Sequence, residues 1–406
     1  MAKTETLGAA FQARPFSKAM IGVFAAITAV GLGCWAWQLM SGLQVTGLSD
    51  TNNWGSYMIF FMFFVGLSAG GLIVASSAHV FNIEPFKKVA LPAVICSTVC
   101  ICLAAAFVVV DLGGIERVWR LFTGPNFASP LIWDVCVIAL YLIINVIDIV
   151  LIVRGDERKV NVLSRVALPT AIAVHSVTAW IFGLQIARTW STAIMAPIFV
   201  ASACDSGLAL LLLALIWLER RNIFRTGEAL FKKLSGLLAV FIAVDAFFIG
   251  CELLTMGYPG GSEAEALKVM AFGATAPFFW FEIVFGLVVP FAILVFAKNR
   301  EKKGLIALAS VLVVLGVFCK RVWLMLTAFI APYAEHVPTM MTDYLSHDAL
   351  SFGSVAPFYT PTLPELGITL GVLALGVLAF MVLCNLLIAK AAKAPAAARD
   401  PEAQHA

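Results

Sequence analysis

Long apolar segments alternate with short polar connections along the whole chain. Each segment holds about 20 residues or more, the length that a helix needs to cross the roughly 30 Å hydrocarbon core of a bilayer. The strands of a membrane barrel would be about half as long, with alternating polar and apolar positions, so the segments predict helices. Ten membrane-spanning helices are predicted, at about 19–41, 56–80, 89–111, 131–153, 165–187, 195–218, 234–256, 272–297, 304–330 and 366–389.

The connections leave no room for a separate soluble domain. The longest, 331–365, contains five prolines, which disfavour a continuous helix. The first apolar segment has no small-residue cleavage site, so we expect a retained helix rather than a signal peptide. The pattern predicts an all-α polytopic membrane protein with one integral domain over 1–406. Within it we expect one helical bundle at about 52–190, a second at about 195–330, and additional helices at about 19–41 and 366–389.

Composition supports the same class of protein. Of the 406 residues, 61% are hydrophobic and 13% are charged, against roughly 45–50% and 25% in soluble domains. These values exclude a water-soluble globule, a disordered chain and a coiled coil. The expected surrounding is the lipid bilayer, and nucleic acid is not an expected partner.

Positive charge is distributed unevenly between the two sides of the predicted helices. Of 27 Lys and Arg residues, 21 lie at the N-terminus, in alternate connections or in the C-terminal tail. The opposite connections hold only Arg117, Arg120, Arg188 and Lys268. Because positively charged connections stay in the cytoplasm, we expect both termini to be cytoplasmic and 112–130 and 331–365 to lie outside.

The cysteines and histidines do not form a cofactor motif. All nine cysteines lie within the predicted helices, and none has the C-x-x-C spacing of an iron–sulfur or covalent haem site. Only His79 and His175 lie in apolar segments, and their expected depths differ by roughly 15 Å, too far for one haem to bridge easily. We therefore expect no metal site, no haem and no iron–sulfur cluster in this chain.

Charged residues within the predicted helices are the strongest functional signal. Each costs about 2.5–3.5 kcal/mol on insertion scales and is usually buried in the bundle or in a wet cavity. They could form static pairs, for instance Glu282 with Arg321, or line a hydrated proton route from the cytoplasm. Six acids outnumber two bases, which favours a proton-conducting interior. The set is Asp134, Asp148, Asp205, Asp245, Glu252, Glu282, Lys320 and Arg321.

Several short motifs resemble the NrfD/PsrC family, the membrane subunits of polysulfide-reductase-like complexes. Their order resembles the ten-helix branch with HybB- and DsrP-type subunits. The most specific match is the stretch from His175 to Gly183, which continues through Arg188 to Met195, Ala196 and Pro197. The others are Trp54-Gly55, the glycine-rich 66–71, Asp111-Leu112-Gly113, Arg117, Asn126, Ser129, Trp133, Trp280-Phe281-Glu282, Arg321 and Pro361-Thr362 with Glu365.

The resemblance implies a quinone-interacting membrane subunit of a respiratory oxidoreductase complex in a bacterial or archaeal cytoplasmic membrane. Its substrate would be menaquinone or ubiquinone. Its partners on the outer face would be a four-cluster ferredoxin-like iron–sulfur subunit and a catalytic subunit of molybdopterin, hydrogenase or cytochrome type. The chain would then carry electrons between the quinone pool and that iron–sulfur partner without containing the catalytic centre of the complex.

Quinol oxidation releases two protons and two electrons, so the quinone ring needs hydrogen-bond partners, one of which accepts a proton. His175 and Asp111 supply both kinds of group and are the predicted catalytic residues. Trp54 and Tyr57 could stack on the ring or bond to it. Asn53 precedes Tyr57 by four residues, so we expect the two to share a helix face.

Alternatives remain open for each of these residues. Arg117 and Arg188 could contact the quinone, pair with neighbouring acids or steer an acidic partner. Trp54 and Tyr57 could belong to the aromatic belt of the membrane interface, and His175 could be structural. A secondary transporter or a passive anchor of a redox complex would also show ten helices.

Overall fold

The computed structural model describes residues 16–49, 52–185, 189–330 and 359–393. Ten helices in these ranges are long and apolar enough to cross a membrane, which confirms the predicted number. They are α1 (Lys18–Ser41), α2 (Ser56–Val80), α4 (Ala90–Asp111), α6 (Pro130–Arg154), α7 (Glu157–Gly183), α8 (Met195–Arg220), α9 (Glu228–Gly257), the continuous span α11–η4–α12 (Ala276–Trp280, Phe281–Val288 and Val289–Val295), α13 (Lys303–Ile330) and α15 (Leu363–Lys393).

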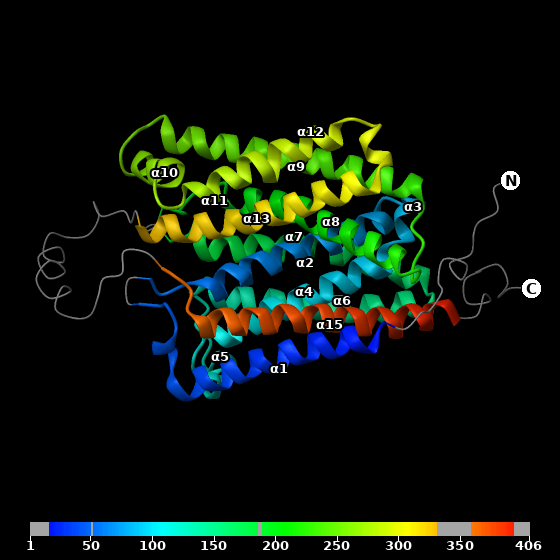
Figure 1. Ribbon diagram of the computed structural model, residues 1–406, viewed down its shortest axis with the longest axis horizontal. Coiled ribbons are helices and arrows are strands. Elements are labelled where there is room, and N and C mark those ends of the chain that lie inside the picture. Colours follow the sequence, from blue (N-terminus) through cyan, green and yellow to red (C-terminus); the bar gives the residue numbers. More distant parts are fainter. Residues whose placement is uncertain (1–15, 50–51, 186–188, 331–358, 394–406) are drawn as a thin grey trace, which may run out of the picture.

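The long helices run side by side along the molecule (Figure 1). We call one end of this bundle the basic end, because Arg154, Arg220 and Lys303 end or begin helices there. Helix α1 begins and α15 ends at the same place. The opposite end, here called the loop end, holds the connections 42–55, 112–129, 184–194 and 258–275.

Shorter helices lie in the connections. At the loop end these are η2 (Leu43–Val45), η3 (Ile115–Arg117), α5 (Arg120–Thr123) and α10 (Ser262–Phe272), and at the basic end they are α3 (Glu84–Lys87) and η5 (Asn299–Glu301).

Helix α7 differs most from its predicted bounds of 165–187. It begins eight residues earlier, at Glu157, and ends at Gly183. Asp156 caps it by accepting a hydrogen bond of 3.1 Å from the backbone N–H of Lys159. The ammonium of Lys159, together with this N–H, lowers the pKa of Asp156 below its ordinary value. Hydropathy missed the first two turns because they are charged and lie beyond the apolar window.

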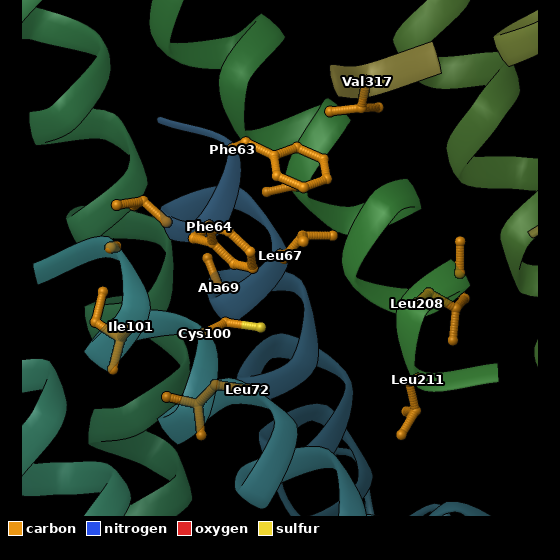
Figure 2. Packing of buried hydrophobic residues seen from close by; sticks show 14 of the residues in the cluster. Phe63, Phe64, Leu67, Ala69, Leu72, Cys100, Ile101, Leu208, Leu211 and Val317 are labelled. Carbon is orange, nitrogen blue, oxygen red and sulfur yellow. The ribbon is translucent and has the colours of Figure 1, made fainter. Parts of the chain in front are cut away.

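Helix α2 is the centre of the molecule. It packs against α4, α7, α8 and α13, and 89% of its most apolar window is buried, against 11% for α1. Figure 2 shows side chains of α2, such as Phe64 and Leu72, lying among those of α4 and α8. The helices of the two predicted bundles therefore meet on α2, while α1 pairs with α15 at the edge.

Three glycine pairs bring helix backbones into direct contact. The pairs are Gly70 with Gly207, Gly31 with Gly371, and Gly286 with Gly316, which join α2 to α8, α1 to α15 and η4 to α13. A Cβ atom at Gly207 or Gly371 would lie 2.5 Å from the Cα of its partner. Small residues serve this purpose in membrane proteins, where close packing rather than the hydrophobic effect drives helix association.

Candidate functional site

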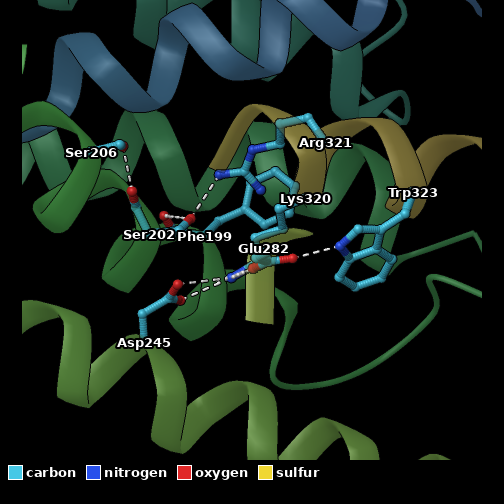
Figure 3. A network of polar contacts seen from close by, with 8 residues as sticks. All are labelled: Phe199, Ser202, Ser206, Asp245, Glu282, Lys320, Arg321 and Trp323. Atoms are coloured by element: carbon cyan, nitrogen blue, oxygen red, sulfur yellow. Dashed lines mark hydrogen bonds and ion pairs between the residues drawn. The ribbon is translucent and has the colours of Figure 1, made fainter. Parts of the chain in front are cut away.

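A buried acid–base centre lies between α9, η4 and α13. The ammonium of Lys320 donates to both carboxylate oxygens of Asp245, at 2.9 and 3.1 Å, and lies 3.5 Å from Glu282. The indole of Trp323 donates to the other oxygen of Glu282 at 2.5 Å (Figure 3). The side chains of Lys320, Asp245 and Glu282 are at most 1% exposed, so the charges meet one another rather than water.

A π-helical segment supplies one carboxylate of this centre. Glu282 lies on η4, which is π-helical over Phe281–Val288. Such segments are rare and are frequent at functional sites. The contact of Gly286 with Gly316 brings this segment against α13, the helix that carries Lys320.

Glu282 pairs with Lys320 and not with Arg321, the partner suggested from the sequence as an example of a static pair. Adjacent helical residues point about 100° apart, so the two bases of α13 face different neighbours. Arg321 lies over the ring of Phe199 at 3.9 Å and donates to Ser202 at 2.8 Å. Two of its other nitrogens, Nε and Nη1, have no hydrogen-bond partner in the described part of the chain.

His175 packs against the same phenylalanine. Its ring is fully buried, and its centroid is 5.3 Å from that of Phe199. Neither ring nitrogen has a partner of good hydrogen-bond geometry among the described residues, although the backbone of Phe199 lies nearby. A Cβ atom at Gly66 of α2 would lie 3.3 Å from His175 and 3.7 Å from Arg321, so this glycine leaves room beside both. Buried polar atoms of this kind require an explanation, and a polar ligand is one.

Aromatic rings connect His175 with the loop end. Phe182 lies 6.2 Å from Phe199, 5.6 Å from Trp54 and 5.3 Å from Trp190, measured between ring centroids. Trp54 is also 6.0 Å from Trp190. We call Trp54, Phe182, Trp190 and Phe199 the aromatic group. The indole N–H of Trp190 has no hydrogen-bond partner among the described residues, and together with the flat apolar faces of the group it suits a flat ring with polar oxygens.

Tyr57 faces away from this group, toward α1. It is 1% exposed and donates to Gln38 at 2.6 Å, and Gln38 in turn donates to the backbone oxygen of Val110. Asp111 follows Val110 and has one buried oxygen without a partner among the described residues. The structure therefore groups Tyr57 with Asp111, and Trp54 with His175.

Asn53 does not share a helix face with Tyr57, so that expectation was wrong. Helix α2 begins only at Ser56, and Asn53 lies before it in an exposed position. The spacing rule for helical residues therefore does not apply to this pair.

Glu365 closes the loop end over the start of α2. Its carboxylate accepts hydrogen bonds from the backbone N–H groups of Gly47 and Thr362, both at 2.8 Å, and from the hydroxyls of Tyr359 and Ser56. Burial and this carboxylate raise the pKa of the Tyr359 phenol above its ordinary value. Glu365 thus joins the first residues of α15 to the connection before α2.

Of the predicted arginines, Arg117 lies in a loop-end connection rather than in the aromatic group. Arg117 is exposed and lies 3.3 Å from Glu116, which fits the pairing alternative. Arg120 lies over the ring of Trp119 at 5.9 Å. Arg188 lies outside the described residues.

The remaining buried aspartates lie in two separate places in the bundle. Asp205 is fully buried, neither of its oxygens has a partner among the described residues, and it lies within electrostatic reach of Asp245 and Lys320. Asp134 and Asp148 are separate from that centre, on α6, where Asp134 accepts a hydrogen bond of 2.6 Å from Thr178.

A small cavity extends from the acid–base centre toward the loop end. It has a volume of about 40 Å³ and is lined by Lys320, Trp323, Trp190 and Glu252, among others. Glu252 accepts a hydrogen bond from Thr192 at 3.2 Å. The volume suffices for one or two water molecules beside polar partners.

No group of three or more His, Cys, Asp or Glu residues that could hold a metal ion occurs in the described ranges. Four residues that contact the predicted ones were not singled out from the sequence, namely Gln38, Phe199 and Trp323 on helices and Trp190 in the connection between α7 and α8. Tyr141 and Asn145 of α6 could have been found, because they follow Asp134 at helical spacing.

The fold and its buried charges define a multi-pass integral membrane protein with polar assemblies inside a helical bundle. A model of the family described as polysulphide reductase, NrfD, matches residues 44–332. The chain belongs to this family.

Three relatives cover most of the chain. A protein of Halobacterium salinarum named as a membrane subunit of dimethyl sulfoxide reductase is 32% identical over 87% of this chain and 87% of its own. A selenate reductase subunit of Mesobacillus selenatarsenatis is 25% identical over 83% and 86%. The Hdr-like menaquinol oxidoreductase integral membrane subunit of Archaeoglobus fulgidus is 27% identical over 88% and 89%.

Proposed function

We propose that the chain is the quinone-interacting membrane subunit of a respiratory oxidoreductase complex. It would exchange electrons between the quinone pool and an iron–sulfur subunit docked at the loop end. The observation that carries this proposal is His175, a fully buried histidine with unpartnered nitrogens beside an aromatic group, in a chain of the NrfD family.

Within the proposed site, each residue has a chemical role. The aromatic group stacks on the quinone ring, and His175 donates or accepts a proton at one ring oxygen as the ring changes redox state. Arg321, two of whose nitrogens have no hydrogen-bond partner among the described residues, stabilises negative charge near that oxygen. Asp111 and Tyr57 lie nearer the loop end, on the side of α2 that faces α1 and apart from the aromatic group.

The partners follow from the relatives. The three relatives are named as subunits of a reductase or an oxidoreductase, which supports a catalytic partner subunit, of molybdopterin, hydrogenase or cytochrome type, and the Archaeoglobus name supports menaquinone. We assign the loop end to the outer face from the charge distribution. The exposed Arg117 and Arg120 would then steer the acidic surface of a four-cluster iron–sulfur subunit.

The buried carboxylates supply a route for protons in this proposal. Asp205, Asp245 and Glu282 share the single ammonium of Lys320, so they cannot all be ionised at low cost. Glu282→Gln and Asp245→Asn in proteoliposomes should reduce proton movement while uncoupled quinol oxidation survives. Unchanged proton movement in both variants would remove these residues from the route.

The site is tested by replacing His175 with Ala in the intact complex. Oxidation of 2,3-dimethyl-1,4-naphthoquinol should fall by roughly 10²-fold or more, the contribution of a positioned acid or base. His79→Ala is the matched control, because His79 is the other histidine within a described span and bonds to Asn161 at the basic end. Assembly is checked by co-purification of the partner subunits.

Two outcomes of this experiment argue against the proposal. Normal turnover in the His175 variant would move the site elsewhere. Absence of quinol oxidation in an intact wild-type complex would favour a passive anchor, the alternative that the sequence left open.

A further inference from the structure

One face of α6 carries a stripe of buried polar residues inside an otherwise apolar helix. Four of its seven buried residues are polar, namely Asp134, Tyr141, Asn145 and Asp148. Their spacing of seven, four and three places them on one helix face. Apolar residues such as Leu140, Ile143 and Val150 occupy exposed positions on the helix. The polar stripe therefore faces the interior of the bundle.

Tyr141 is the centre of a hydrogen-bond network that joins three helices. Its hydroxyl donates to the backbone oxygen of Ser68 on α2 at 2.9 Å and lies 2.7 Å from the hydroxyl of Ser97 on α4. The Ser97 hydroxyl also lies 3.2 Å from the amide oxygen of Asn145. Both serines and Tyr141 are fully buried. Hydroxyl groups that both donate and accept hydrogen bonds can pass a proton without acquiring net charge.

Polar atoms continue from this network to the basic end. Asn145 Nδ2, Asp148 Oδ1, Ser76 Oγ and Ser164 Oγ are buried without a hydrogen-bond partner in the described part of the chain. They belong to α6, α2 and α7, and all lie within about 14 Å of the basic ends of these helices at 1.5 Å per residue. Buried polar atoms are usually satisfied, so several unpartnered ones on neighbouring helices indicate a hydrated region.

The other end of the stripe approaches the proposed quinone site. Asp134 accepts a hydrogen bond from Thr178, which lies three residues after His175 on the same face of α7. Between Asp134 and Tyr141 the stripe is interrupted by the half-buried Ile138, over a distance of about 10 Å along the helix. This apolar turn separates the two polar halves.

We infer that the α6 stripe conducts protons between the basic end of the bundle and His175, with Tyr141 as a hydroxyl relay and the Ile138 turn as a dry barrier against leakage. The inference rests on the proposed function. During the oxidation of one quinol, His175 accepts the two ring protons one after the other, and the two electrons leave to the iron–sulfur subunit. Each proton passes to Asp134, across the Ile138 turn to Tyr141, and leaves through Asp148 before the next one follows. Tyr141 gives up its own proton as it receives another, so no net charge stays on it.

The test uses the complex in proteoliposomes with a pH dye in the lumen. The vesicles receive 2,3-dimethyl-1,4-naphthoquinol and a membrane-impermeant acceptor, and the direct reaction of the two is subtracted with protein-free vesicles. Only complexes whose loop end faces the bulk solution react, so their basic ends face the lumen. The readout is the number of protons that appear in the lumen per quinol oxidised, which does not depend on the rate.

We expect the wild-type complex to acidify the lumen. Tyr141→Phe, which removes only a hydroxyl, and Asp148→Asn should both reduce the proton yield clearly below that of the wild type, to the share carried by the carboxylates around Lys320. Ser235→Ala is the control, because Ser235 is an equally buried hydroxyl that bonds to the backbone of its own helix, α9. It should keep the wild-type yield. If the complex with Tyr141→Phe does not assemble, the proton yield of the Asp148→Asn complex tests the inference instead.

Three results would overturn the inference. A wild-type proton yield in Tyr141→Phe or in Asp148→Asn would exclude the stripe as the route. A wild-type complex that oxidises quinol without acidifying the lumen would do the same while leaving the proposed function intact. Finally, Ile138→Ser should increase passive proton leakage under a potassium diffusion potential, without any quinol, and no increase would contradict the assigned barrier. Absence of quinol oxidation, by contrast, would count against the proposed function itself.

Discussion

Lys320 lies in the membrane interior in contact with two carboxylates, and the neighbouring Arg321 contacts a phenyl ring and a serine hydroxyl instead. Two adjacent bases thus serve two different assemblies. A buried ion pair contributes little net stability, but removal of one partner leaves an uncompensated charge. Substitution of any single residue of the acid–base centre should therefore destabilise the protein.

A stability measurement can test this sensitivity. Lys320→Met should lower the stability of the purified protein by about 3–5 kcal/mol, because Asp245 and Glu282 lose their counterion. Adding Asp245→Asn should recover part of the loss, since one of the two carboxylates is then neutral. Thermal unfolding in detergent, followed by circular dichroism, measures both variants. Equal or greater destabilisation in the double variant would contradict the pairing of Lys320 with Asp245.

Glu365 illustrates the opposite case, a buried carboxylate whose oxygens are saturated by hydrogen-bond donors. Glu365→Ala would leave the N–H groups of Gly47 and Thr362 without their acceptor, at a cost of about 1–3 kcal/mol for each buried group. We expect faster proteolysis at the loop end in this variant. Glu228→Ala, at the first turn of α9 on the basic end, is the control and should retain the wild-type cleavage pattern.

At the scale of helices, direct contact between backbones at glycine pairs sets the distance between neighbouring helices. Gly207→Ala would place a methyl group against Gly70 and force α2 and α8 apart, which we expect to cost about 1–3 kcal/mol, as for other overpacked sites. Gly250→Ala on α9 is the matched control, because nothing lies within 4 Å of its Cβ position. It should be neutral or slightly stabilising. Thermal unfolding of the two variants side by side gives the comparison, and equal midpoints would refute the contact.

The sequence predicted the elements well because the bilayer imposes a length on each helix. All ten spans were found, and the charged first turns of α7 and α9 were missed because they extend beyond the membrane window. Contacts between side chains of different helices were harder to predict from the sequence. Nothing local in the chain indicates that Tyr57 meets Gln38, or that Lys320 rather than Arg321 meets Glu282, since these contacts depend on how each helix is rotated in the bundle. The π-helical turn at Glu282 likewise has no hydropathy signal.

At the scale of the whole molecule, the bundle separates a basic end from a loop end, and the charge distribution assigns them to the two sides of the membrane. Single cysteines in place of Asn126 and Arg158 test the orientation. A membrane-impermeant maleimide added to intact cells should label the first and leave the second unlabelled until the cells are opened. Strong labelling at 158 in intact cells would reverse the orientation and place the iron–sulfur partner in the cytoplasm.

The contact of α1 with α15 also has a consequence for how the protein is made. Among the described helices α1 is synthesised first and its partner α15 last, so Gly31 can meet Gly371 only after the chain between them has been synthesised. Until then α1 has only its contacts with the other helices, such as the hydrogen bonds of Gln38 with Tyr57 and Val110. A chain that is released before α15 has been translated cannot form this contact. In such a product the face of α1 that α15 covers would stay exposed to lipid.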